Sequence, residues 1–128
     1  SPQLIRSRPM AYIILPEAAH VIEKLRILDV EVEPLPMGQY EVERYVITEN
    51  RLKADFFEGF QERIVSATTE SEDMDLPADG WWVPADQERF NLAIECLEPE
   101  AHCGLIRYRV LEIENTIPIL RVIKPTLK

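Results

Sequence analysis

The sequence predicts an α+β fold, with a mixed β-sheet of about five to six strands and two helices packed on one face. The chain has 128 residues, of which 46% are hydrophobic and 29% are charged, as is usual for one globular domain. Two segments repeat apolar residues at the helical period, and several short segments are rich in β-branched and aromatic residues. Prolines, of which there are ten, punctuate these segments. We expect a linker or tag remnant over residues 1–10 and a single domain over 11–128.

The two helices are expected over residues 17–28 and 86–97. Pro16 and Glu17 suit the first turn of the first helix, because proline tolerates that turn and an acidic group favours the positive end of the helix dipole. Asp86 is a suitable N-cap for the second helix, which Pro99 ends. In both segments one face is apolar, formed by Ala18, Val21, Ile22, Leu25 and Leu28 in the first and by Phe90, Ala93, Ile94 and Leu97 in the second.

The strands are expected over residues 11–15, 30–33, 41–48, 60–69, 81–84 and 105–113. The first two, with the helix between them, form a β-α-β unit with a right-handed crossover by default. The acidic segment 70–75 is expected to be a solvated turn. Pro84 ends the expected strand 81–84. The segment 117–122 is apolar but is interrupted by Pro118.

The net charge of −9 argues against nucleic acid and anionic membranes as partners, since both select positive charge. Residues 30–100 carry five basic and eighteen acidic side chains. This acidic body is either a solvated surface or a face that meets a basic partner such as a neighbouring domain. No apolar run is long enough to predict a membrane span.

The motif search predicts no catalytic residue and no metal ligand in this chain. His20 and Glu23 form an H-x-x-E pair, but a catalytic zinc needs three protein ligands, and the other histidine is the distant His102. Cys96, His102 and Cys103 match no structural zinc spacing. We expect Cys96 to be a buried thiol, and a disulfide to Cys103 stays open. A small enzyme using Cys96, His102 or Cys103 is a third hypothesis. It is disfavoured because a nucleophile pair also needs an orienting group and an oxyanion hole.

Trp81 and Trp82 are the candidate contact residues. Neighbours in a strand point to opposite faces, so one tryptophan is expected in the core and the other at a surface or beneath a partner. Gln87, in the same segment, is grouped with them as a candidate for a domain contact or a ligand contact.

Three stretches together carry a family resemblance. They are Arg8-Pro9-Met10-Ala11-Tyr12-Ile13-Ile14 with the helix after it, Leu76-Pro77-Ala78-Asp79-Gly80-Trp81-Trp82-Val83-Pro84-Ala85-Asp86-Gln87 running into Leu97-Glu98-Pro99-Glu100, and Ile117-Pro118-Ile119-Leu120-Arg121-Val122. Their order and spacing resemble the region after the catalytic domain in bacterial zinc carboxypeptidases of the carboxypeptidase A-like family. The match covers most of the chain.

The resemblance implies a non-catalytic C-terminal accessory domain that packs on, or modulates, a peptidase domain in the same polypeptide. The zinc and its ligands would belong to that absent domain, so no cofactor is expected here. The chain starts at Ser1 rather than methionine, which favours an excised piece of a longer protein. The alternative is a free-standing module that binds peptide or glycan through exposed aromatic side chains near Trp81 and Trp82.

Overall fold

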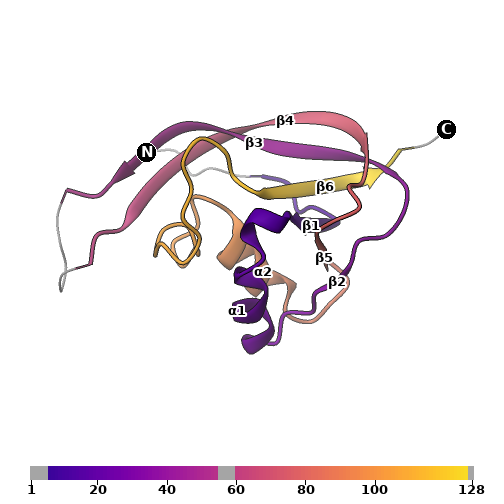
Figure 1. Ribbon diagram of the computed structural model, residues 1–128, viewed down its shortest axis with the longest axis horizontal. Helices are drawn as coiled ribbons and strands as arrows, with labels where there is room; N and C mark the ends of the chain where they lie inside the picture. The colour runs from indigo at the N-terminus through magenta and orange to yellow at the C-terminus, as the bar shows by residue number, and fades with distance from the viewer. Residues whose placement is uncertain (1–5, 55–59, 127–128) are drawn as a thin grey trace.

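A six-stranded sheet, with strand order β2-β5-β1-β6-β3-β4, forms the centre of the fold in the computed structural model. The structure describes residues 6–54 and 60–126. Figure 1 shows both helices on one side of this sheet. The elements in chain order are β1 (Ala11–Ile14), the 3-10 helix η1 (Pro16–Ala18), α1 (Val21–Ile27), β2 (Glu33–Pro34), β3 (Gln39–Leu52), β4 (Arg63–Asp75), β5 (Trp81–Pro84), α2 (Phe90–Leu97) and β6 (Ile119–Pro125).

The α+β class, the six strands and the two helices on one face are confirmed. The expected mixed sheet is instead antiparallel at every strand pairing among the described residues. β5 lies between β1 and β2 and is antiparallel to both, so β1 and β2 run parallel but do not touch. The β-α-β unit therefore exists in a split form, which local sequence patterns do not reveal.

The core lies on both faces of the sheet because alternate side chains of a strand point to opposite sides. Tyr12 and Ile14 of β1 are fully buried in the main cluster, which also holds the apolar faces of α1 and α2. Ala11 and Ile13, equally buried, belong to a smaller cluster on the opposite face together with Trp82. β1 therefore supplies core side chains in both directions, as its continuous apolar run predicts.

The strands β3 and β4 form a long hairpin, with a β-bulge in β3 between Ile47 and Glu49. The prediction that residues 70–75 form a turn is wrong, because this acidic segment continues β4 and pairs with β3 as far as Asp75. Backbone pairing decides the conformation here, while the charged side chains remain exposed to water.

Both helices are shorter than predicted. The first segment starts as η1 and continues as α1 only from Val21. The second begins at Phe90, and Asp86 does not cap it: Arg89 takes the N-cap position without a side-chain hydrogen bond. The Gln87 side chain pins the preceding turn instead, because its Nε2 donates to the Pro84 carbonyl at 2.8 Å.

The predicted strand over 105–113 is wrong, since this segment folds into consecutive turns. The amides of Val110 and Leu111 both donate to the carbonyl of Leu105, and Arg109 has a positive φ of 61°. Leu105, Ile106, Leu111 and Ile113 are still buried, but as part of a turned segment against the main core, while Tyr108 is 42% exposed. β6, by contrast, is a central strand that the proline-interrupted tail did not predict. No helix in the described part of the chain is long and apolar enough to cross a membrane.

Candidate functional site

A network of buried charges lies where the end of α2 meets the sheet. Its centre is Arg121 of β6, whose side chain is 1% exposed and which is the one buried charged residue among those described. Its Nε donates to Glu43 Oε1 at 3.0 Å and its Nη1 to Glu98 Oε2 at 2.6 Å, while its Nη2 donates to the Ser7 carbonyl. Strand register explains part of this geometry, because Tyr12, Arg121 and Glu43 are direct cross-strand neighbours on β1, β6 and β3.

Glu98 is the acceptor that joins the helix to the sheet. It occupies the C-cap of α2 in an extended conformation, and Pro99 then prevents the helix from continuing. Besides Arg121, the hydroxyls of Tyr12 and Tyr45 donate to Glu98 at 2.5 and 2.8 Å, and Arg6 Nη1 donates at 3.1 Å. Each carboxylate oxygen thus accepts two hydrogen bonds, which offsets the cost of burying the charge.

Arg6 and Glu100 form the outer part of the network. Arg6 Nη1 and Nη2 donate to the two oxygens of Glu100 at 2.7 and 3.0 Å, which is a bidentate ion pair. Both residues also bind the edge of β4: Glu100 Oε2 accepts from the Ala67 amide at 3.0 Å, and Arg6 Nη2 donates to the Ala67 carbonyl at 2.8 Å. The Arg6 guanidinium lies 5.2 Å from the centre of the Tyr45 ring.

The network raises the pKa of both tyrosines. Burial is the main cause, and the charge of Glu98 adds to it, so the pKa of Tyr12 and that of Tyr45 lie well above 10. The folded state therefore holds protons that the unfolded chain would release. A raised folded pKa contributes stability that is complete below pH 10 and is lost as the pH rises above it.

A pocket of about 360 Å³ adjoins this network and is lined by Arg6, Arg8, Tyr12, Glu95 and Arg121 among others. Its charged floor is already engaged, because Glu98 accepts four hydrogen bonds and Arg121 binds three partners. The arrangement fixes the positions of elements and leaves no unoccupied carboxylate oxygen on Glu98 for acid–base work.

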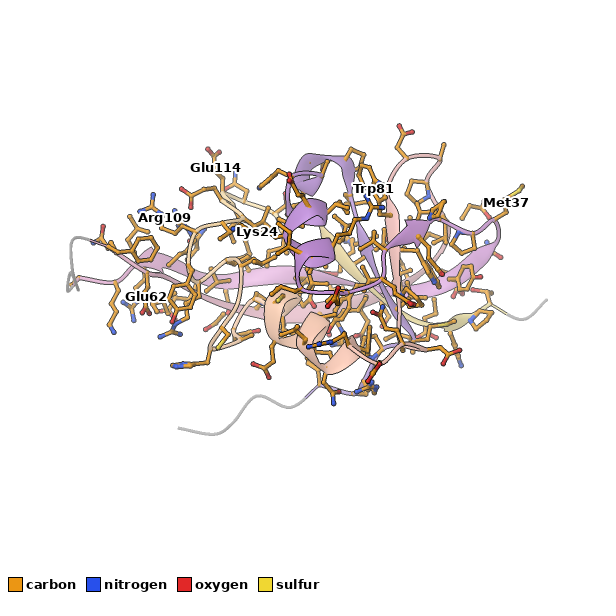
Figure 2. All side chains as sticks on the ribbon, turned by 90° about the horizontal axis from the view of Figure 1, so that it is seen from below. Lys24, Met37, Glu62, Trp81, Arg109 and Glu114 are labelled. Carbon is orange, nitrogen blue, oxygen red and sulfur yellow. The ribbon has the colours of Figure 1, made fainter. Side chains whose placement is uncertain are left out.

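The structure separates the two tryptophans as the strand alternation predicts. Trp82 is 8% exposed and packs against Tyr40 with ring centres 5.5 Å apart. Trp81 is partly buried against the main core and lines an open groove beside α1 with Ala19, Ile22, Glu23, Arg26 and Ile27. Figure 2 shows Trp81 close to α1. Ile27 is 69% exposed, so the groove has an apolar side with a charged rim.

Gln87 makes three hydrogen bonds within the chain. Besides the bond to Pro84, its Oε1 accepts from the Glu31 amide at 2.8 Å and its Nε2 donates to the Glu31 carbonyl at 3.1 Å. These bonds tie the loop before α2 to the segment before β2. A contact role for Trp81, Trp82 and Gln87 toward a domain or ligand stays a prediction.

The residues of the metal-like motifs do not gather into a metal site in the described part of the chain. His20 and Glu23 are both exposed, and His20 Nε2 lies 3.1 Å from the Val110 carbonyl. Cys96 is buried and Cys103 exposed, and both are free thiols. Burial raises the pKa of Cys96. Within residues 6–54 and 60–126, no three His, Cys, Asp or Glu side chains lie close enough together to hold a metal ion.

The charge network was missed by the sequence reasoning, although each stretch of the resemblance contributes to it. Arg8-Pro9-Met10-Ala11-Tyr12 supplies Tyr12, Leu97-Glu98-Pro99-Glu100 supplies both acids, and Ile119-Leu120-Arg121-Val122 supplies the central arginine. The signal that could have found it is a single charge inside an apolar strand run, since a buried arginine requires a buried acidic partner.

Comparison with known proteins shows that the chain is similar in sequence to one part of a carboxypeptidase. It is 29% identical over 122 residues to carboxypeptidase 2 of Trichophyton tonsurans and 27% identical over 124 residues to that of Trichophyton rubrum. These matches cover 93% and 94% of this chain and 23% of each relative. A probable carboxypeptidase 2 of Arthroderma benhamiae is 29% identical over 96 residues, which are 74% of this chain and 18% of that protein.

The chain therefore spans about a quarter of the length of the curated relatives that it matches. It is similar to one region of carboxypeptidase-named proteins, as the resemblance implies. The relatives found are fungal, so the bacterial part of that expectation is not supported. No family model and no solved structure matches the chain.

Proposed function

We propose that this chain is a non-catalytic accessory domain of a zinc metallocarboxypeptidase, follows the peptidase domain in the same polypeptide and packs on it. One observation carries the proposal: the similarity runs through 93% of the chain yet occupies only 23% of the carboxypeptidase relative. A region of that size leaves about three quarters of the relative for a peptidase domain with its own metal ligands. In this proposal the zinc belongs to that other domain.

The groove beside α1 is the docking surface that we propose for the peptidase domain. Ile27 and Trp81 give it two apolar side chains at or near the surface, and Glu23 and Arg26 flank them. Partly exposed apolar patches with polar rims are typical of contacts between domains. Trp82 has no part in this surface, because it is buried on the other face of the sheet.

The first test uses the chain by itself. We expect neither stoichiometric zinc by metal analysis nor hydrolysis of blocked dipeptides that end in an aromatic, basic or acidic residue. Either tightly bound stoichiometric zinc or turnover that increases with protein concentration would overturn the non-catalytic assignment.

The second test measures binding of the chain to the separately produced peptidase domain by calorimetry. Ile27→Glu should weaken binding at least tenfold, because it places a charge in an apolar contact. Met37→Glu is the matched control, since Met37 is 96% exposed and lies outside the groove. Equal affinities for both variants and the unmodified chain would refute this docking surface.

The free-standing binding module is the second candidate, and it rests on the same partly buried Trp81 beside a groove. A glycan or peptide site needs several polar groups that converge on the ligand. The groove offers Glu23 and Arg26 at its rim. Binding of a defined oligosaccharide or peptide that is lost in Trp81→Ala, with no affinity for the peptidase domain, would favour this candidate.

A further inference from the structure

We propose that the buried charge network is a binding site for the chain's own N-terminal segment, residues 6–10, which we call the strap. These contacts fix the path along which the strap reaches the sheet. Resting on the proposed function, the inference extends to the whole protein: a preceding peptidase domain would be joined to a segment that is anchored on this domain from Arg6 onward.

The strap is bound by side chains at its outer end. Arg6 makes the bidentate pair with Glu100 and a further bond to Glu98 at 3.1 Å, both from the segment that ends α2. Its side chain is 13% exposed, although it precedes the first strand by five positions. Chain segments outside regular elements are ordinarily solvated and mobile, so such burial of a charged side chain requires specific partners.

The next two residues are held by different elements. The Ser7 carbonyl accepts from Arg121 Nη2, so the most buried charged side chain among the described residues also binds the strap backbone. Arg8 Nη1 donates to Asn91 Oδ1 at 2.5 Å, and the Arg8 guanidinium lies 4.8 Å from the centre of the Phe90 ring. Both ends of α2 therefore contact the strap: Phe90 and Asn91 at the start of the helix bind Arg8, and Glu98 at its C-cap binds Arg6.

The inner end of the strap joins the sheet. Pro9 is buried, the Met10 amide donates to the Val122 carbonyl at 2.8 Å, and the Met10 carbonyl accepts from the Ala85 amide at 3.0 Å. All five strap residues are thus bound or buried, and their partners come from several separate parts of the chain. A merely covering segment would not need contacts to so many elements.

The network differs in kind from the ion pairs on the surface. Arg44 and Glu72 lie 3.6 Å apart with side chains 55% and 49% exposed, and such pairs contribute little. Glu98 and Glu100 are 12% and 22% exposed and accept from Arg6 at 3.1 and 2.7 Å. Release of the strap would take the Arg6 charge from Glu100 and would leave Glu98 with Arg121 as its positive partner, and the partly buried Glu100 carboxylate opposes that release.

Native-state trypsin cleavage of the Arg6–Ser7 bond tests the strap directly. Trypsin must take the Arg6 side chain into its own acidic pocket, so it can cut only after Arg6 has left Glu98 and Glu100. The next arginine precedes Pro9, which removes it as a competing site. We expect the folded 128-residue chain to be cut at this bond at least a hundredfold more slowly than a free peptide of residues 1–12.

The variant Glu100→Gln removes the bidentate charge, and Glu72→Gln is the matched control on an exposed pair. We expect Glu100→Gln to speed cleavage at Arg6–Ser7 at least tenfold, after correction for any change in the free energy of global unfolding measured in urea. We expect Glu72→Gln to leave the cleavage rate unchanged. If Glu100→Gln does not fold, Arg8→Ala provides the same test without touching the buried network. Cleavage of the folded chain at the rate of the free peptide, or equal cleavage rates in all folded variants, would refute the proposal that the network binds the strap.

The consequence for the whole protein is tested in the full-length polypeptide, by the distribution of distances between a label in this domain and one in the peptidase domain. We expect a narrow distribution that broadens in Glu100→Gln. A broad distribution in the unmodified protein, with Arg6–Ser7 protected, would overturn the fixed orientation while leaving the strap intact. Zinc or turnover in the isolated chain would instead mean that the proposed function fails.

Discussion

Replacing Arg121 with methionine should destabilise the fold more than most single substitutions. Methionine fills much of the same volume but donates no hydrogen bond and carries no charge. The change removes the bonds to Glu43, Glu98 and the Ser7 carbonyl. Glu98 keeps its other three donors, while Glu43, at 22% side-chain exposure, loses its ion-pair partner.

The expected loss follows from these contacts. Removing one partner of a buried ion pair costs about 3–5 kcal/mol, and the loss of several charge-assisted bonds places Arg121→Met within that range. For a domain of 128 residues, an unfolding entropy of about 2.1 cal/mol/K per residue converts each kcal/mol into about 4 °C. The melting temperature should therefore fall by about 10–20 °C.

Urea denaturation of Arg121→Met, Glu98→Gln and the double variant measures this effect and separates the pair from its surroundings. The double variant should be more stable than the sum of the single losses implies, with a coupling energy of about 2 kcal/mol. A loss below about 1 kcal/mol in Arg121→Met, or a coupling energy near zero, would show that the network does not hold the end of α2 on the sheet.

Three further predictions concern the two tyrosines of the network, Asp29 and Gly80. Because the pKa of Tyr12 and of Tyr45 is raised, each residue should lower the unfolding free energy by about 1.4 kcal/mol per pH unit above pH 10. Urea titrations at successive pH values measure the combined slope, which Tyr12→Phe should halve. Asp29 has a φ of 63° after α1, so Asp29→Gly should raise the unfolding free energy measured in urea by about 0.5 kcal/mol, and Asp29→Ala should lower it by about 1 kcal/mol. A change of the same sign in both variants would refute this. Gly80 has a φ of 135°, and a Cβ there would lie 2.9 Å from the Ile14 carbonyl oxygen, so Gly80→Ala should cost about 2–3 kcal/mol, and an unchanged melting temperature would contradict that.

The sequence predicts those parts of the fold that local periodicity determines. The buried run Ala11–Ile14 lies where expected, and so do the apolar faces of the two helical segments except at Leu28, which is 39% exposed. The strand at Trp81–Pro84 ends at its proline, and its two tryptophans point to opposite faces. These features depend on neighbours within one or two turns of chain, and such neighbours are visible in a sequence.

Long-range pairing decides the features that the sequence did not predict. The acidic residues up to Asp75 look like a loop, yet they are strand because β3 lies alongside them. The apolar residues between Leu105 and Ile113 look like a strand, yet the turn at Arg109 folds them back on the core. Tertiary contacts override local preference in both cases.

The charge network escaped prediction for a related reason. Arg6, Glu98 and Arg121 are separated by 92 and 23 positions in the chain, and no spacing rule connects them. Trp81, Trp82 and Gln87, which form one visible motif, were the natural candidates instead. In the structure, that motif contains a core residue and a loop-tying residue beside the one tryptophan that lines the groove.

The place of β6 in the sheet has a consequence for how the protein is made. β6 is the last strand in the sequence, yet it lies between β1 and β3 in the middle of the sheet. Before it is synthesised, the nascent chain can form only two disconnected pieces, β2-β5-β1 and β3-β4, each with an open edge. The domain therefore completes its folding after nearly all of its residues have left the ribosome. A premature stop between Pro84 and Ile119 would yield not a smaller domain but one truncated chain with two unjoined sheet pieces, whose open edges favour aggregation and proteolysis.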